Sequence, residues 1–147
     1  MLWAMDASEL LDRCQSLVTL VAAAAGDGER DRRVSQRVID AAGDAGLFRA
    51  IVPTSLGGSG FGVEVLANAT RIVAHGCPAT AWTLSFLALH AWLLAKFPAA
   101  GRAELFAAGP SPFAPAPLAP TGRALPADGG FVVDGRWEWA TAVAHAD

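Results

Sequence analysis

The sequence has little of what metal sites and disulfide scaffolds need. Its 147 residues include two cysteines, three histidines and no tyrosine. Cys14 and Cys77 form no CxxC pair, and no histidine stands at metal-ligand spacing from either of them. These absences argue against a zinc site or a disulfide framework, and they favour a reducing, cytoplasmic compartment.

Positive charge is also sparse, and it is interleaved with negative charge. The chain has 11 Lys and Arg against 14 Asp and Glu, which gives a net charge of −3. The densest run, ERDRR at residues 29–33, alternates the two signs. This pattern is typical of a solvated segment at the start of a helix rather than of a nucleic-acid surface. We therefore expect no nucleic-acid partner.

Long apolar runs are limited to one. Residues 79–95 carry no charge over 17 positions, which is the lower limit for a membrane-spanning helix. The run contains threonine, serine and histidine, and neither a second span nor a charge-flanked topology accompanies it. The N-terminus also lacks the basic and apolar regions of a secretory signal. We predict a buried central helix over 79–95 and no membrane association.

Helical periodicity dominates the first two thirds of the chain. Asp6 and Glu9 have the spacing of a capping box, and apolar residues then recur at helical spacing until Gly26, where we expect the helix to end. The glycine-rich stretch 54–62 lacks the lysine and the spacing of a phosphate loop. We interpret it as a flexible turn that follows a short extended segment. Further helices are predicted at residues 35–45, 63–75, 79–95 and 98–109.

Proline changes the pattern after residue 109. Six prolines between residues 110 and 126 exclude a helix there. We therefore divide the chain into a helical domain at 1–109 and the incomplete start of a β-domain at 110–147.

A hairpin is predicted near the end of the chain. Phe131–Val133 precede Asp134–Gly135, and an Asp-Gly pair is the strongest short hairpin signal. Residues 136–141 are then expected to return as the second strand. In that strand Trp137 and Trp139 would point to the same side of the sheet.

Three stretches in this order resemble the acyl-CoA dehydrogenase superfamily, and in particular its flavin-dependent monooxygenase branch. They are AGLFRAIVPTSLGGSG (45–60), CPATAWTLSFLALHAWLLAKFP (77–98) and APTGRALPADGGFVVDGRWEWATAVAHAD (119–147). The superfamily has a helical N-terminal domain, a middle β-barrel and a C-terminal helical bundle. The resemblance therefore implies a mainly α N-terminal domain followed by the beginning of a β-barrel domain, in a truncated version of that fold.

The resemblance also implies a flavin site in the last stretch. Trp139 would pack against the isoalloxazine face, Thr141 would contact its N5 region with Ala140 between them, and the turn with Thr121 and Gly122 would lie near the pyrimidine end. The alternative reading is structural, because tryptophans on one strand face are often barrel core. One departure concerns the backbone here: Ala142 stands where the monooxygenase branch usually has glycine.

The central helix would border the substrate cavity in the same family. Trp82, Phe86 and His90 stand at i, i+4 and i+8, which places them on one helix face. Each also has a purely structural reading, as packing aromatics and a core histidine.

The implied activity is hydroxylation of a small, aromatic substrate with oxygen and reduced flavin, FAD or FMN, supplied by a separate flavin reductase. An acyl-CoA dehydrogenase is the alternative enzyme. The Thr-Glu and Gly-Ser-Asp stretches of the dehydrogenases are, however, replaced here by FAPAPLAPTGRA (113–124). Both catalytic groups of the superfamily come from the C-terminal bundle, so no catalytic residue is assigned. The isolated chain is expected to be inactive and to associate as a homo-oligomer. A non-catalytic helical interaction module is the third alternative.

Overall fold

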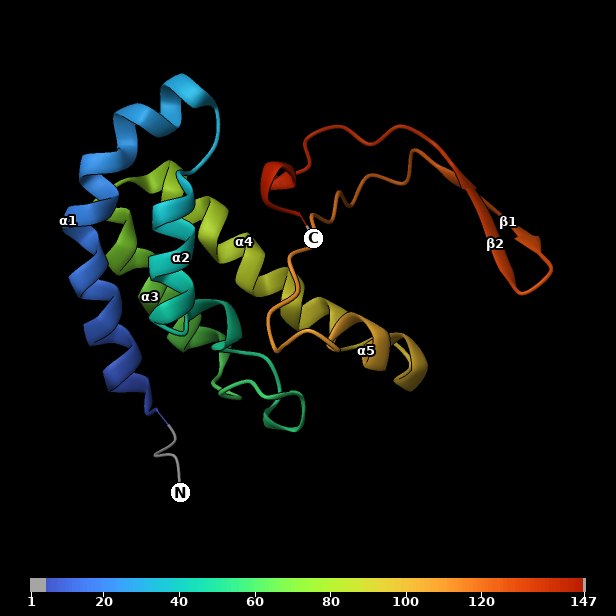
Figure 1. Cartoon of the computed structure of the whole chain (residues 1–147), viewed down its shortest axis with the longest axis horizontal. Coiled ribbons are helices and arrows are strands. Elements are labelled where there is room, and N and C mark those ends of the chain that lie inside the picture. Colours follow the sequence, from blue (N-terminus) through green and yellow to red (C-terminus); the bar gives the residue numbers. More distant parts are fainter. Residues whose placement is uncertain (1–4, 147) are drawn as a thin grey trace.

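Four helices form a packed body in the computed structural model, which describes residues 5–146 (Figure 1). In this body α3 lies against both α1 and α4, and α2 packs on α1. A fifth helix follows the body and leads into the C-terminal segment. The helices are α1 (Ala7–Asp31), α2 (Gln36–Asp44), α3 (Val63–Ala74), α4 (Pro78–Leu94) and α5 (Ala99–Leu105).

Helix α1 begins as predicted and ends later than predicted. The Asp6 carboxylate accepts a hydrogen bond from the Glu9 amide at 2.8 Å, which confirms the cap. The helix continues through Gly26 and Gly28 to Asp31, because each helical glycine costs only about 1 kcal/mol relative to alanine. Arg32 then adopts a left-handed conformation at φ 52° and ends the helix. The run at 29–33 therefore closes a helix, and its prediction as a helix start was wrong.

Helix α4 is the predicted central helix. Pro78 occupies its first turn, where the missing N–H is tolerated. Leu84, Leu87, Ala88 and Ala91 are fully buried. The hydroxyl of Thr83 donates to the Ala79 carbonyl at 3.1 Å, which satisfies one polar side chain inside this apolar run. No helix within residues 5–146 is both long and apolar enough to cross a membrane.

The segment between α2 and α3 differs from the prediction in two ways. The expected extended stretch begins instead as a 3₁₀ turn, η1 (Leu47–Arg49), and a second turn, η2 (Thr54–Leu56), follows. The glycine-rich loop is anchored to this stretch by backbone hydrogen bonds, from Ser59 N to Arg49 O and from Gly60 N to Val52 O. A Cβ on Gly58 would lie 2.0 Å from the Val52 carbonyl oxygen, so the loop requires glycine for a close backbone approach.

The β-hairpin uses a different Asp-Gly pair from the one predicted. Strands β1 (Arg123–Ala127) and β2 (Gly130–Asp134) are antiparallel, with Leu125 opposite Val132. The turn is Asp128–Gly129, where Gly129 has φ 76°, and not Asp134–Gly135. Both Asp-Gly pairs carry the same turn signal. The strands that form are the two extended runs on either side of Asp128–Gly129.

Residues 136–141, the predicted return strand, form no strand. Figure 1 shows the hairpin projecting away from the helical body and the chain then returning to it. All residues of both strands are exposed. Residues 111–117 before the hairpin are half-buried, and Phe113 packs edge-on against Phe48 with ring centroids 4.8 Å apart. The domain division at residue 109 stays a prediction.

Candidate functional site

The three predicted cavity residues of α4 form an aromatic ladder, in which each ring contacts the next. The Trp82 and Phe86 rings lie 4.6 Å apart between centroids, and the Phe86 and His90 rings meet edge-on at 5.4 Å. Trp82 is 58% exposed whereas His90 is 5% exposed, so the ladder runs from the surface into the core. The Nδ1 atom of His90 is buried and has no hydrogen-bond partner among the described residues. Helical spacing therefore did predict which side chains meet.

A groove between α3 and α4 lies beside this ladder. It has a volume of about 420 Å³, and Phe86 shares its wall with apolar residues of both helices, among them Val63, Leu66 and Leu89. Leu89 and Val63 also line a neighbouring cavity of about 350 Å³ that reaches Trp92. The middle ring of the ladder thus faces an apolar depression wide enough for a small ring.

The predicted turn at Thr121 and Gly122 is held by residues that follow the hairpin. The Thr121 hydroxyl donates to the Arg136 carbonyl at 2.7 Å. A Cβ on Gly122 would lie 2.1 Å from the Trp137 ring, so the indole packs directly on the glycine backbone. These contacts clamp the two ends of the hairpin together, and they fix the direction in which the chain leaves it.

The predicted flavin-facing stretch, residues 137–142, is irregular and strongly bent. Trp139 has φ 61° and is 93% exposed, whereas Trp137 is 40% exposed. The prediction that both indoles share one strand face was therefore wrong. Ala142 has φ 68°, which is the left-handed conformation that glycine adopts most easily, and it stands where the resemblance suggested a glycine. The sequence departure thus falls on a position that needs a positive φ.

The same stretch returns to the N-terminal half of α4. Ala140 and Ala142 line a cavity of about 150 Å³ together with Thr83, which follows Trp82 in the helix. His145, in the short turn η3 (Val143–His145), lines this cavity as well. The structure therefore brings the predicted flavin segment next to the predicted cavity helix.

His145 was not among the predicted site residues. Burial lowers its pKa, and the positive charge of Arg33 lowers it further, while a hydrogen bond to the Val34 backbone acts in the opposite direction. Its Nε2 atom is buried and has no hydrogen-bond partner in the described part of the chain. The one sequence signal for this site was the run at 29–33, which was interpreted only as solvated.

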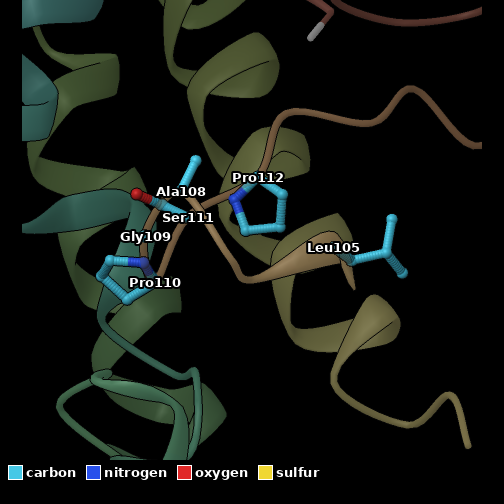
Figure 2. A pocket seen from close by; sticks show the side chains of 6 residues that line it. All are labelled: Leu105, Ala108, Gly109, Pro110, Ser111 and Pro112. Carbon is cyan, nitrogen blue, oxygen red and sulfur yellow. The ribbon is translucent and has the colours of Figure 1, made fainter. Parts of the chain in front are cut away.

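Cys14 and the cavity after α5 offer no comparable chemistry. Burial in the core raises the pKa of Cys14 to about 11, which keeps this thiol protonated. Within residues 5–146 no group of three His, Cys, Asp or Glu side chains is placed to hold a metal ion. Figure 2 shows the turn after α5, where Pro110 and Pro112 flank Ser111 around a cavity of about 300 Å³. No charged side chain lines that cavity.

The residues of the bent stretch fit a planar aromatic cofactor better than the turn does. Among residues 5–146 no ring packs against Trp139, so its exposed indole offers a flat surface, and Thr141 is half-buried two residues further on. Gly122 is already covered by Trp137, and the hydroxyl proton of Thr121 is already donated. Trp139 and Thr141 could therefore contact a flavin ring, while Thr121 and Gly122 would hold the segment in place.

The fold can now be assigned to a class. Residues 6–104 match the family described as acyl-CoA dehydrogenase, N-terminal domain. Because this match covers most of the chain, the protein belongs to that family, and the predicted mainly helical fold with a β-segment is confirmed.

The relatives include a hydroxylase and a flavin-dependent monooxygenase subunit. The chain is 31% identical to the pigment production hydroxylase of a Rhodococcus species over 95% of its length, and 30% identical to the oxygenase subunit HsaA of Mycobacterium tuberculosis over 96%. It spans only 36% of the length of each of these relatives. The resemblance to the monooxygenase branch is thus confirmed for the N-terminal part of such proteins.

Solved structures agree with this assignment. The crystal structure of HsaA from M. tuberculosis superposes with a TM-score of 0.92 at 30% identity, over 97% of this chain and 39% of that one. XiaF from a Streptomyces species, solved in complex with FADH2 and glycerol, gives a TM-score of 0.90 at 27% identity, over 96% of this chain and 36% of that one. A relative with this fold therefore binds reduced flavin.

Proposed function

We propose that this chain forms the N-terminal part of an oxygenase component that hydroxylates a small aromatic substrate with reduced flavin and oxygen. The observation that carries the proposal is the position of Phe86. Its ring lies between Trp82 and His90 and also lines the apolar groove of about 420 Å³. A planar substrate ring entering there would meet an aromatic face, and aromatic pairs add about 0.5–1.5 kcal/mol beyond their burial.

The residues of α4 would orient the substrate. Trp82 and Phe86 would contact its ring, and His90 would present the polar atom at the deep end of the ladder. That histidine has one buried nitrogen without a described partner, and a buried polar atom gains most from a hydrogen bond supplied by a ligand. The neighbouring groove is lined mostly by apolar residues, and its polar members are Thr70, Arg71 and Ser85. A few polar contacts would therefore select how a phenol-like molecule enters.

The bent stretch would hold the flavin. Trp139 would cover one face of the ring and keep water from it, and Thr141 would contact the ring edge, with Ala140 between them. Thr121 and Gly122 would position the stretch through their contacts with Arg136 and Trp137. Bound reduced flavin supplies the electrons for activation of oxygen, and a separate reductase would deliver it, as the name "oxygenase subunit" of the relative HsaA implies.

The test uses the complete polypeptide that carries this chain, with a flavin reductase and a panel of phenols. We expect oxygen-dependent formation of a hydroxylated product, and Phe86→Ala should raise KM more than it lowers kcat. Turnover of an acyl-CoA with an electron acceptor in the absence of oxygen would instead support the dehydrogenase and overturn the proposal.

Flavin binding provides a second readout. Trp139→Ala should weaken reduced-flavin binding measured by fluorescence quenching, while Phe131→Ala is the matched control because its aromatic ring is also exposed, at 68%. Equal flavin affinities of the two variants would show that Trp139 is not part of the flavin site. A polypeptide that binds neither flavin nor phenols would favour the non-catalytic interaction module.

A further inference from the structure

Two segments far apart in the sequence place three basic side chains around one small cavity. Arg32 and Arg33 come from the connection between α1 and α2, and His145 comes from η3. All three line the cavity of about 150 Å³, and Thr83 of α4 lines it as well. Figure 1 shows the C-terminal turn, drawn in red, returning to the helical body after the hairpin. The folded chain therefore assembles a positive cluster that neither segment has alone.

The positive charge of this cluster is not neutralised by a described carboxylate. The two nearby aspartates form ion pairs with the preceding arginine, Arg30, at 2.6 Å for Asp27 and 3.5 Å for Asp31. None of the ion pairs within residues 5–146 includes Arg32, Arg33 or His145. The small cavity is thus lined by two arginines and a histidine and by no carboxylate.

The cavity continues into a larger one that could hold the remainder of a ligand. Arg32, Arg33 and Thr83 also line this neighbouring cavity of about 500 Å³. Glu29 and Cys77 line only the larger cavity, so the one acidic side chain stands away from His145. An anionic group would therefore be favoured at the His145 end, and uncharged parts of the same molecule would be favoured at the other end.

His145 supplies the observation that points to a ligand atom. Its ring is hydrogen-bonded to the Val34 backbone. Its Nε2 atom is buried and has no hydrogen-bond partner among the described residues. A buried polar atom is normally satisfied by protein, water or ligand. His145 and Arg33 line the same small cavity, and Nε2 could donate to an anionic oxygen there once the imidazole is protonated.

We propose that Arg32, Arg33 and His145 form a binding site for a phosphate-type oxyanion. Guanidinium groups bind such oxyanions through paired N–H donors, and these charge-assisted bonds are stronger than neutral ones. The imidazole would add a third contact once it is protonated. The oxyanion is either free inorganic phosphate or the phosphate of flavin mononucleotide. The second source rests on the proposed function, because Ala140 and Ala142 of the predicted flavin segment line the same cavity.

The first experiment titrates the 147-residue chain with sulfate at constant ionic strength and follows the histidine ring protons by NMR. Sulfate keeps its double negative charge across the pH range of histidine titration, so only the protein changes protonation. We expect the His145 signals to shift saturably and those of His75 and His90 to stay. Arg33→Gln should weaken binding about tenfold or more. Arg123→Gln, in the exposed hairpin, is the control and should change nothing.

The pH dependence separates this site from unspecific charge attraction. The charged or titratable groups that line the two cavities with His145 are Arg32, Arg33, Glu29 and Cys77. The pKa of His145 is lowered in the free chain and should rise on binding, so sulfate affinity should increase as the pH falls through the titration of this imidazole. His145→Asn should remove that increase. Absence of a His145 shift, or equal loss of affinity in Arg33→Gln and Arg123→Gln, would overturn the site.

The second experiment separates the two sources of the oxyanion. Flavin mononucleotide, riboflavin and inorganic phosphate are each added to the chain with sulfate bound. Displacement by the mononucleotide and by phosphate, but not by riboflavin, supports a flavin-phosphate site. Displacement by phosphate alone supports a free oxyanion site. If neither the mononucleotide nor phosphate displaces the bound sulfate, the proposal is overturned. Trp139→Ala should leave phosphate binding unchanged, so the oxyanion site can stand even if the flavin proposal fails.

Discussion

The helical body and the hairpin contain similar apolar residues in opposite environments. Leu84 and Leu87 of α4 are completely buried, whereas Leu125 of β1 is 63% exposed and Phe131 of β2 is 68% exposed. The helices cover one another, and each supplies the layer that the next one needs. A two-stranded sheet has no such layer of its own and is marginal in water. The comparison shows that the body is stabilised by its own contacts, while the hairpin depends on whatever covers it.

The largest expected effect is loss of a core leucine. Leu84→Ala should destabilise the chain by about 2–5 kcal/mol, because it leaves a cavity in the fully buried face of α4. Leu125→Ala in the hairpin should stay within about 0.5 kcal/mol. Leu89 is half-buried and should fall between them. Urea unfolding followed by far-UV circular dichroism measures all three, and similar losses for Leu84→Ala and Leu125→Ala would contradict the comparison.

The next comparison is between two glycine substitutions, one in the body and one in the hairpin. In Gly58→Ala the new Cβ meets the Val52 carbonyl oxygen, and we expect a loss of about 1–3 kcal/mol from overpacking. Gly130→Ala in β2 meets nothing within 4 Å and should change stability by less than about 0.5 kcal/mol. Thermal melting distinguishes the two variants. A Gly58→Ala variant with the melting temperature of the parent chain would show that the loop is as free as the sequence suggested.

A smaller effect is expected where the two regions join. Phe113 lies between α5 and the hairpin and packs on Phe48 of the body. Removing the ring pair in Phe113→Ala should cost about 0.5–1.5 kcal/mol in addition to lost burial. Leu118→Ala is the control, since Leu118 is 86% exposed. If both variants unfold at the same urea concentration as the parent chain, the proline-rich segment contributes nothing to the body.

The smallest effect is a pH dependence at the start of α1. Hydrogen bonds from the Glu9 amide and from Ser8 lower the pKa of Asp6. Its contribution is therefore fully present above the unfolded pKa, about 3.9, and is lost as the pH falls through the lower folded value. Hydrogen exchange of the first α1 amides should accelerate over this range, with the hairpin amides as internal reference. Asp6→Asn should remove the pH dependence, and an unchanged acid profile in that variant would exclude Asp6 as its cause.

The sequence predicted those parts that depend on neighbours along the chain. The cap at Asp6, the proline in the first turn of α4 and the ladder at Trp82, Phe86 and His90 follow from helix geometry, which is the same in any protein. The buried character of α4 followed from its uncharged length. The resemblance in three stretches identified the family, because order and spacing survive when most residues change.

Local signals failed where several segments compete for the same role. Two Asp-Gly pairs give the same turn signal, and only the pairing of 123–127 with 130–134 distinguishes them. The glycine-rich loop has the composition of a mobile turn, but the backbone of residues 49–53 fixes it. In each case the deciding contact is made by residues that the local pattern does not contain.

The sequence by itself determined the helices, their buried faces and the residues that meet on one face of α4, because helical periodicity is set by the backbone. Only the tertiary structure decided which strands pair, that Trp139 is exposed while Trp137 covers Gly122, and that His145 shares a cavity with Arg33. The physical reason is the range of the interactions. Backbone hydrogen bonds in a helix join residues four apart, whereas these contacts join segments whose separation along the chain carries no periodic signal.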